Sequence, residues 1–404
     1  MTHRRRTLLL ALGATAALAA GCAGFTPTPR TRFDLEAHRG GRGLAPENTL
    51  AAFSNAIDLG VTTLELDIGL SADGVVVVSH DTALNPDHTR DAAGQWLAPA
   101  NGRSGPTIRS LTLAQLQSYD VGRLNPSSSY GRQFALQLPR DGERIPTLEA
   151  VFDLVRARGP AAATVRFNIE TKIDPTKPDE TAAPEPMVRA LLAVIDKAQM
   201  ADRVTVQSFD WRTLALVGQL APTMSRAYLS TPRTLKDKRW TAGLDAASFG
   251  STPRLVKAAA GTSGGPLVWS PAFADLDAAQ VKEAQGLGMK VLPWTVNQRA
   301  DMIRLMDLGV DGIITDYPDV LRDLVRERGC RCRPREGVPR ERRAATARHH
   351  RRAHRRAAPP GRRPRRPAVG PGTRQRRAAG RPAAALRRGA AEPARPARIE
   401  RAVQ

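Results

Sequence analysis

The central part of this 404-residue chain has no cysteine. The three cysteines, Cys22, Cys330 and Cys332, lie toward the two ends, so no disulfide framework can stabilise residues 33–328. Aromatic residues amount to only 4% of the chain, and residues 330–404 contain none. That stretch therefore lacks the Phe, Tyr and Trp side chains on which nucleic-acid bases commonly stack.

The most apolar run, Leu8 to Ala20, is shorter than the roughly 20 residues that cross a membrane. It follows three arginines, and a basic segment before a short apolar run is typical of an export signal. The run ends in Leu18-Ala19-Ala20-Gly21-Cys22, which resembles a bacterial lipobox, although Ala19 replaces a branched apolar residue. We expect a signal peptide over 1–21, a linker over 22–32 and export to the periplasm or cell surface. Lipidation of Cys22, which would anchor the chain to a membrane, and plain cleavage nearby are both open.

The positive charge of the chain is concentrated at one end. Of the formal net charge of +22, residues 330–404 carry +20, from 24 Arg, 4 Glu and no Lys. The rest of the chain is close to neutral. The excess of positive charge therefore belongs to a C-terminal tail and does not indicate a basic binding surface. We expect disorder over 329–404, because Arg, Ala, Pro and Gly bury too little apolar surface to fold. An inert extension, a polybasic arm and a reading-frame artefact remain open, and no nucleic-acid partner is expected.

Strand-like and helix-like segments alternate through residues 33–328 in one continuous pattern. This alternation predicts an α/β fold of one domain, an irregular (β/α)8 TIM barrel. Helices are expected after the caps Asn48/Thr49 and Thr147, and over 111–119, 187–198, 211–220, 277–287 and 299–308. The strand candidates are Phe33–His38, Thr62–Ile68, Val75–His80, Val165–Glu170, Val204–Ser208, Ser225–Leu229, Val268–Ser270, Lys290–Val296 and Gly312–Thr315.

One candidate, Val75–His80, follows its predecessor too closely to be a barrel strand, because a parallel crossover needs a dozen or more residues. It is expected to form an antiparallel hairpin arm, with Asp73-Gly74 as a two-residue turn. That turn predicts a register in which Asp67 faces His80. Residues 85–146, rich in Asn, Pro, Gly and Ser, are expected to form a loop-rich insertion near the active end.

In such a barrel the functional groups lie at the carboxyl ends of the strands. Glu65 and Asp67 share one face of a strand, and Glu170 ends another. Converging carboxylates repel one another unless a cation joins them, so we expect one hard divalent cation, Ca²⁺ or Mg²⁺. A solvated strand face, and neutralisation of one carboxylate by Lys172, are the alternatives.

Two histidines and two fixed cations also lie at predicted strand ends. Arg39 and Lys172 beside a metal suit a phosphate ester, whose charge needs stabilisation as the bond breaks. His38 and His80 can act there as acid and base. The glycines after Arg39 either let the backbone approach the substrate or only form the turn.

A series of eight short motifs between residues 33 and 325 resembles, in order and spacing, that of the glycerophosphodiester phosphodiesterases. Each motif is weak alone, but eight in order are specific. They are His38-Arg39-Gly40, Pro46-Glu47-Asn48-Thr49, Glu65-Leu66-Asp67, His80-Asp81, Ile145-Pro146-Thr147-Leu148, Asn168-Ile169-Glu170, Pro293-Trp294-Thr295-Val296-Asn297 and Asp311-Gly312-Ile313-Ile314-Thr315-Asp316.

The resemblance implies hydrolysis of a small-molecule glycerophosphodiester to sn-glycerol 3-phosphate and an alcohol. It also implies a role for each site residue: metal binding by Glu65, Asp67 and Glu170, acid–base chemistry by His38 and His80, phosphate contacts from Arg39 and Lys172, and Trp294 beside the glycerol.

We expect Glu47 to lie behind the site, near the helix start, and Asn48 to cap that helix. The long 85–146 segment and the basic tail depart from the family pattern. Two other functions stay open: a phospholipase-like enzyme that acts on intact lipid with the same barrel, and a non-catalytic surface lipoprotein.

Overall fold

The computed structural model describes residues 33–98, 105–262 and 264–329. The expected signal peptide, Cys22, the linker and the basic tail from residue 330 onward lie outside the described residues. Within them, no helix combines the length and the apolar character that crossing a membrane requires.

Eight strands form a parallel, nearly closed barrel, which confirms the predicted fold class. Hydrogen-bonded neighbours follow the order β8-β7-β6-β5-β4-β2-β1-β9. The strands are β1 (Asp34–Ala37), β2 (Thr63–Leu70), β4 (Arg166–Thr171), β5 (Val204–Ser208), β6 (Ser225–Ser230), β7 (Leu267–Pro271), β8 (Met289–Val291) and β9 (Gly312–Thr315).

The barrel closes between β8 and β9 through irregular backbone. The strand predicted over 290–296 was too long, because β8 ends at Val291 and Pro293, which has no N–H to donate, interrupts the ladder. Two backbone hydrogen bonds hold the seam. The N–H of Val296 donates to the carbonyl of Ile314 at 3.0 Å, and the N–H of Ile314 donates to the carbonyl of Pro293 at 3.1 Å.

Helices surround the barrel, and the predicted ones are present. Thr49 and Thr147 cap α1 and α4 by accepting backbone N–H groups. Three helices were not predicted, namely α3, α7 and α10. The helices are α1 (Leu50–Leu59), α2 (Leu113–Leu116), α3 (Ser129–Gln133), α4 (Leu148–Ala157), α5 (Pro184–Lys197), α6 (Trp211–Leu220), α7 (Thr252–Ala260), α8 (Ala278–Gly286), α9 (Arg299–Asp307) and α10 (Pro318–Glu327).

The remaining strand, β3 (Val76–Val78), runs antiparallel to β2, its only strand partner in the described part of the chain, and Val77 also forms an isolated bridge with Thr147. The expected hairpin arm is therefore confirmed, but its register was wrong by one residue. The structure pairs Leu70 with Val76, which places Ser79 opposite Asp67. The N–H of Ser79 donates to the carbonyl of Asp67 at 3.0 Å.

The slip comes from the turn, which has three residues between Ser71 and Val75 instead of two. Ser71 N–H donates to the carbonyl of Val75 at 3.0 Å. Gly74 closes the turn with φ +78°, a left-handed conformation that glycine adopts without strain. His80 therefore lies one residue past the position opposite Asp67, where the chain leaves the hairpin.

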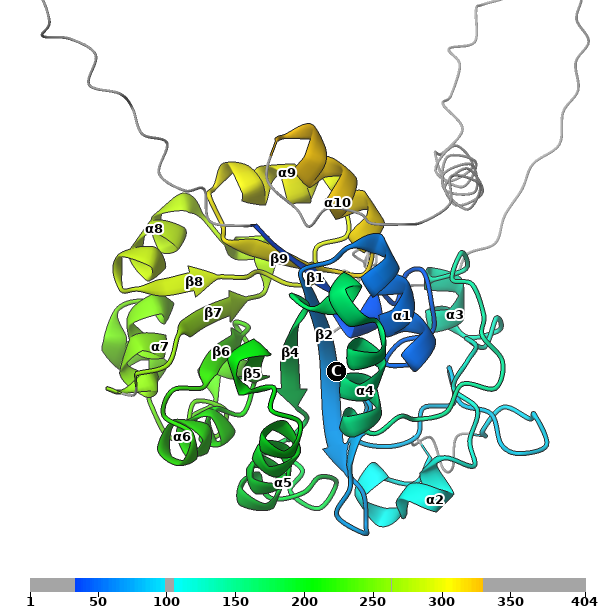
Figure 1. Ribbon diagram of the computed structural model, residues 1–404. Helices are drawn as coiled ribbons and strands as arrows, with labels where there is room; N and C mark the ends of the chain where they lie inside the picture. The colour runs from blue at the N-terminus through cyan, green and yellow to red at the C-terminus, as the bar shows by residue number, and fades with distance from the viewer. Residues whose placement is uncertain (1–32, 99–104, 263, 330–404) are drawn as a thin grey trace, which may run out of the picture.

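The 85–146 insertion packs beside α1 and α4, with α2 and α3 outside the ring of helices (Figure 1). It is loop-rich as predicted, because α2 and α3 are its only α-helices among the described residues. A small apolar core holds it against the hairpin, formed by Val77, Leu84, Ile108, Leu116, Val121 and Ile145. This core fixes the insertion next to the carboxyl end of β3.

Candidate active site

Three carboxylates from two neighbouring strands come together at the barrel mouth. The β2–β4 register pairs Asp67 directly with Glu170, and Glu65 lies two residues earlier on the same face of β2. One oxygen from each of the three lies within 4.8 Å of the others, and all three side chains are buried. The fold therefore brings together the three carboxylates that were predicted to form a cluster.

The two glutamates of this cluster are unusually basic. Burial, reinforced by Asp67, raises the pKa of Glu65 well above its usual value. Burial also raises the pKa of Glu170 to about 7, although Lys172 opposes the shift. Asp67 behaves differently, because His80, Lys172 and Arg39 outweigh the effect of burial and hold its pKa below the usual range. Mutual repulsion is thus only partly compensated by the protein.

The cluster fits a hard divalent cation. Oδ1 of Asp67 is buried and has no hydrogen-bond partner, which is costly unless something positive contacts it. Glu65 is held in place by the side-chain amide of Gln207 and the backbone N–H of Arg39, each at 2.7 Å. Oxygen ligands of this kind suit Ca²⁺ or Mg²⁺.

Both predicted phosphate-binding cations currently pair with carboxylates. Nζ of Lys172 lies 2.8 Å from Oε1 of Glu170 and 3.7 Å from Oδ1 of Asp67. Lys172 therefore forms an ion pair with Glu170, which agrees with the alternative that it neutralises one carboxylate of the cluster. A divalent cation at the cluster would replace this compensation and leave the ammonium group available to an anionic ligand.

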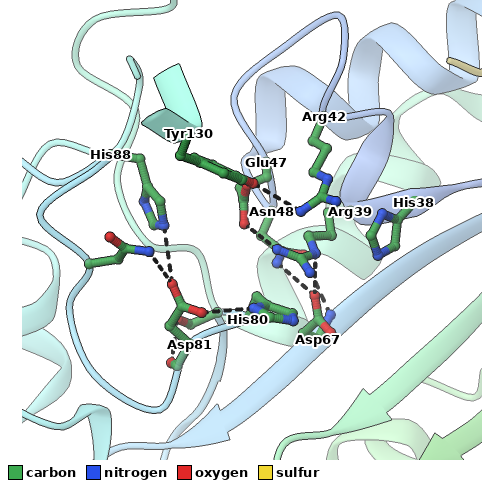
Figure 2. Close-up of polar contacts among 12 residues, drawn as sticks. His38, Arg39, Arg42, Glu47, Asn48, Asp67, His80, Asp81, His88 and Tyr130 are labelled. Carbon is green, nitrogen blue, oxygen red and sulfur yellow. Dashed lines mark hydrogen bonds and ion pairs between the residues drawn. The ribbon is translucent and has the colours of Figure 1, made fainter. Parts of the chain in front are cut away.

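Arg39 is fixed by the residues around it (Figure 2). Its Nη1 donates to Glu47 at 2.7 Å, and its Nε lies 3.5 Å from Asp67. The backbone at Arg39 is left-handed, with φ 50°, which strains a residue other than glycine and is common at functional sites. Glu47 lies behind the site as expected, because it clamps Arg39 and also accepts a hydrogen bond from Tyr130 of the insertion.

His38 is oriented by a carboxylate from the last barrel strand. Its Nδ1 lies 2.6 Å from Oδ1 of Asp316. Because an ionised carboxylate only accepts hydrogen bonds, the proton sits on Nδ1 and leaves Nε2 for chemistry. Burial lowers the pKa of His38 to about 4 even though Asp316 favours the charged ring. Asp316 itself is buried, and Arg42 and His38 hold its pKa below the usual range.

His80 is oriented in the same way, with its Nδ1 2.8 Å from Oδ1 of Asp81. Burial, assisted by Arg39 and Lys172, lowers its pKa to about 4. Both rings are therefore neutral at neutral pH, with an acceptor nitrogen turned away from the orienting carboxylate. Both predicted histidines are thus oriented in the same way, and their acid–base roles stay a prediction.

The turn and the packing around it account for the glycines of the first loop. Gly40 and Gly41 have φ values of +80° and +87°, which the turn requires. A Cβ on Gly40 would lie 2.7 Å from Cβ of Ala52, and one on Gly43 would lie 2.4 Å from the ring of Tyr317. Side chains larger than glycine would therefore clash with protein atoms at these two positions.

Trp294 follows β8 at the mouth. Its indole N–H donates to the carbonyl of Ser270 at 2.9 Å, and Phe209 packs edge-on against it with ring centroids 5.3 Å apart. The indole is thus fixed in orientation and only partly buried. It can present an apolar face to the carbon skeleton of a ligand.

Some site residues had no correct role in the sequence analysis. Asn48 does not cap the helix, because Thr49 does, and its amide instead donates to Asp67 at 3.0 Å. Asp316 was part of the last of the eight motifs, without an assigned role. The insertion residues His88 and Tyr130 carried no sequence signal, because a loop has no period that places its side chains.

The match to known proteins agrees with this site. Residues 38–320 match the model of the glycerophosphoryl diester phosphodiesterase family. A glycerophosphodiester phosphodiesterase of Caldanaerobacter subterraneus subsp. tengcongensis is 29% identical over 72% of this chain and 98% of its own length. One from Bacillus subtilis is 30% identical over 70% of this chain and 83% of its own length.

Solved structures show the same fold. A glycerophosphoryl diester phosphodiesterase structure from Silicibacter pomeroyi is 35% identical, with a TM-score of 0.65, and the match covers 74% of this chain and 95% of that one. A phosphodiesterase of Oleispira antarctica, in complex with the product sn-glycerol-3-phosphate, has a TM-score of 0.52 at 24% identity, covering 73% and 97%. On the family match and these relatives, the chain belongs to the glycerophosphoryl diester phosphodiesterase family and is an enzyme of that activity.

Proposed function

We propose that the protein hydrolyses glycerophosphodiesters to sn-glycerol 3-phosphate and an alcohol, with one bound divalent cation, Ca²⁺ or Mg²⁺. The observation that carries the proposal is the pair of neutral histidines, each tied through Nδ1 to a carboxylate, at the same mouth as the carboxylate cluster. The product in the Oleispira antarctica structure supports the choice of substrate class.

The histidines move the protons of the reaction. One ring accepts at Nε2 the proton of the attacking hydroxyl, either water or the substrate's own neighbouring hydroxyl. The other donates a proton to the departing alkoxide. When the substrate's own hydroxyl attacks, loss of the alcohol leaves a cyclic phosphate, which water then opens to glycerol 3-phosphate while the two rings exchange their roles. A phosphate anion beside either ring raises the pKa of that ring, which allows one of them to carry the proton when substrate is bound.

Glu65, Asp67 and Glu170 would hold the cation, which stabilises charge on the phosphate when bound. Lys172 and Arg39 lie next to this cluster and would bind the same phosphate oxygens. Trp294 would pack against the glycerol. The phospholipase-like and non-catalytic alternatives are not favoured by the relatives, which are named for phosphodiesterase activity on glycerophosphodiesters.

The test is release of glycerol 3-phosphate from glycerophosphocholine, with and without EDTA, by the wild type and by His80→Ala. Activity is expected to need the divalent cation, and the substitution to lower the rate at least ~10²-fold. Restoration by Ca²⁺ or by Mg²⁺ identifies the metal. Rates that neither EDTA nor His80→Ala changes would overturn the mechanism.

We also propose that the protein is exported to the periplasm or cell surface and anchored through lipidated Cys22. The support is the basic segment, the short apolar run and the lipobox-like ending of residues 1–22. Fractionation of cells that express the wild type and Cys22→Ala tests this. Membrane-bound wild type and soluble, exported Cys22→Ala are expected, and equal membrane binding of both would contradict the anchor.

A further inference from the structure

The two histidines of the mouth are supported differently. Asp316, the partner of His38, is contacted by residues outside the insertion: the side-chain amide of Asn297 donates to its Oδ2 and Nε of Arg42 donates to its Oδ1, each at 2.7 Å. The insertion reaches Asp316 indirectly, through Tyr130, whose hydroxyl accepts a hydrogen bond from Nη1 of Arg42 at 3.0 Å. The carboxylate of Asp81, the partner of His80, is contacted by His80 and by two residues of the insertion, Asn85 and His88.

The oxygen of Asp81 that does not face His80 is the one that the insertion contacts (Figure 2). Nδ2 of Asn85 donates to Oδ2 of Asp81 at 2.6 Å. Nε2 of His88 lies 3.5 Å from the same oxygen. Asn85 is itself oriented, since its Oδ1 accepts the backbone N–H of Asp87 at 2.8 Å. A continuous polar chain therefore runs from His80 through Asp81 to the insertion.

His88 is held on its other side as well. Its ring packs against Tyr130, with centroids 6.3 Å apart, and Tyr130 donates to Glu47 at the mouth. Burial would lower the pKa of His88, but Asp81 and Glu47 outweigh it and raise the pKa above its usual value. When this ring is protonated, it stabilises the ionised form of Asp81, which His80 needs as its hydrogen-bond acceptor.

A cavity of ≈ 20 Å³ lies next to these polar side chains and is lined in part by Glu47, His80, Asn85 and His88. It is large enough for one water molecule. Truncation of His88 would enlarge it and loosen the insertion, so a test has to keep the volume of the ring.

We propose that His88 and Asn85 are positioning residues for the hydrolysis, which act through Asp81 on His80. This inference rests on the proposed function, because it assigns both residues to one half of the acid–base pair. Asp81, held on its second oxygen, keeps the Nδ1 proton of His80 in place and leaves Nε2 for the reacting atoms. The insertion is then part of the catalytic apparatus, and not only a cover for it.

A double-mutant cycle separates positioning from general support of the fold. The measured quantity is kcat on glycerophosphocholine, whose poor leaving group keeps the reaction dependent on both histidines. His88→Phe, which keeps a ring but loses the nitrogen atoms, is expected to lower kcat about 10- to 100-fold, the scale for partners of a functional group. His88→Gln keeps a donor in the place of Nε2 and should recover most of the loss. In the His80→Ala background, His88→Phe is expected to have no further effect.

Arg144→Ala is the matched control, because it removes an exposed hydrogen bond of the same insertion, to the carbonyl of Ser118. It should leave kcat unchanged. The same fractional loss from His88→Phe with and without His80 would show general support of the fold and overturn the proposal. So would a His88→Phe enzyme of unchanged kcat.

A second readout does not depend on activity. The Nδ1 proton of His80, followed by NMR, is expected to be protected in the wild type and to exchange rapidly in His88→Phe at unchanged melting temperature. Equal protection in both would contradict the positioning role. A wild type that releases no glycerol 3-phosphate would overturn the proposed function, while this readout still decides the role of His88.

Discussion

Nδ1 of His38 lies 2.6 Å from Oδ1 of Asp316, although the two residues are 278 positions apart in the chain. The contact follows from the pairing of the first and last barrel strands. In that register Ala37 is the partner of Thr315, so the next residue of each strand stands beside the other. The pairing of β1 with β9 therefore brings His38 to its orienting carboxylate.

Asp316→Asn should lower kcat about 10²- to 10⁴-fold with little change in KM, because an amide no longer selects the Nδ1–H tautomer of His38. Steady-state kinetics with glycerophosphocholine measure it, and circular dichroism shows whether the fold is retained. A kcat within twofold of the wild type in a folded variant would exclude the orienting role of this carboxylate.

Asp67→Asn should weaken binding of the divalent cation at least ~10-fold, because it removes the negative charge of a carboxylate whose Oδ1 has no protein hydrogen-bond partner. The measurement is the rise of the melting temperature with added Ca²⁺ or Mg²⁺, since a ligand that binds only the folded state stabilises it. Asp73→Asn, in the exposed turn of the same hairpin, is the control and should keep the wild-type response. Equal responses of the two variants would place the cation elsewhere.

Metal affinity should fall as the pH drops below about 7, where Glu170 becomes protonated in the metal-free protein. The sign follows from competition, because a carboxyl group must lose its proton before it binds the cation, so metal binding releases protons. Calorimetric titrations in buffers of different ionisation enthalpy count those protons. Binding with no proton release at pH 6 would show that the ligands are already ionised.

Removal of residues 330–404 should leave both kcat and the melting temperature unchanged. The family match ends at residue 320, and α10 ends at Glu327, so every residue of the proposed site is retained. Activity and thermal melting of the shortened and full chains are compared at low salt, where effects of the arginine-rich segment are largest. Lost activity would give that segment a role in catalysis.

Much of the fold could be predicted from the sequence because it depends on local patterns. The alternation of strands and helices required only the apolar periods, and the caps Thr49 and Thr147 were recognisable as residue types. Helices α7 and α10 were missed although each carries proline near its start, at Pro253 and Pro318, a typical helix-start signal. The length of β8 was misjudged because apolar character continues past Pro293 while the hydrogen-bond ladder does not.

The carboxylate cluster was also predictable, because its geometry follows from two simple rules. The period of two along a strand places Glu65 beside Asp67, and parallel strands in a barrel bring their carboxyl ends together, which adds Glu170. The hairpin showed the limit of such rules, since one extra turn residue moved His80 away from the position opposite Asp67.

By itself, then, the sequence determined the barrel, the buried carboxylate cluster and the place of the two histidines, because period and strand order follow from residue type alone. Only the tertiary structure decided what holds the histidines: Asp316 reaches His38 through the pairing of β1 with β9, and Asp81 is held by Asn85 and His88 through packing of the insertion. The physical reason is that a loop has no repeating geometry. Its side chains find their partners only when its own small core packs against the hairpin.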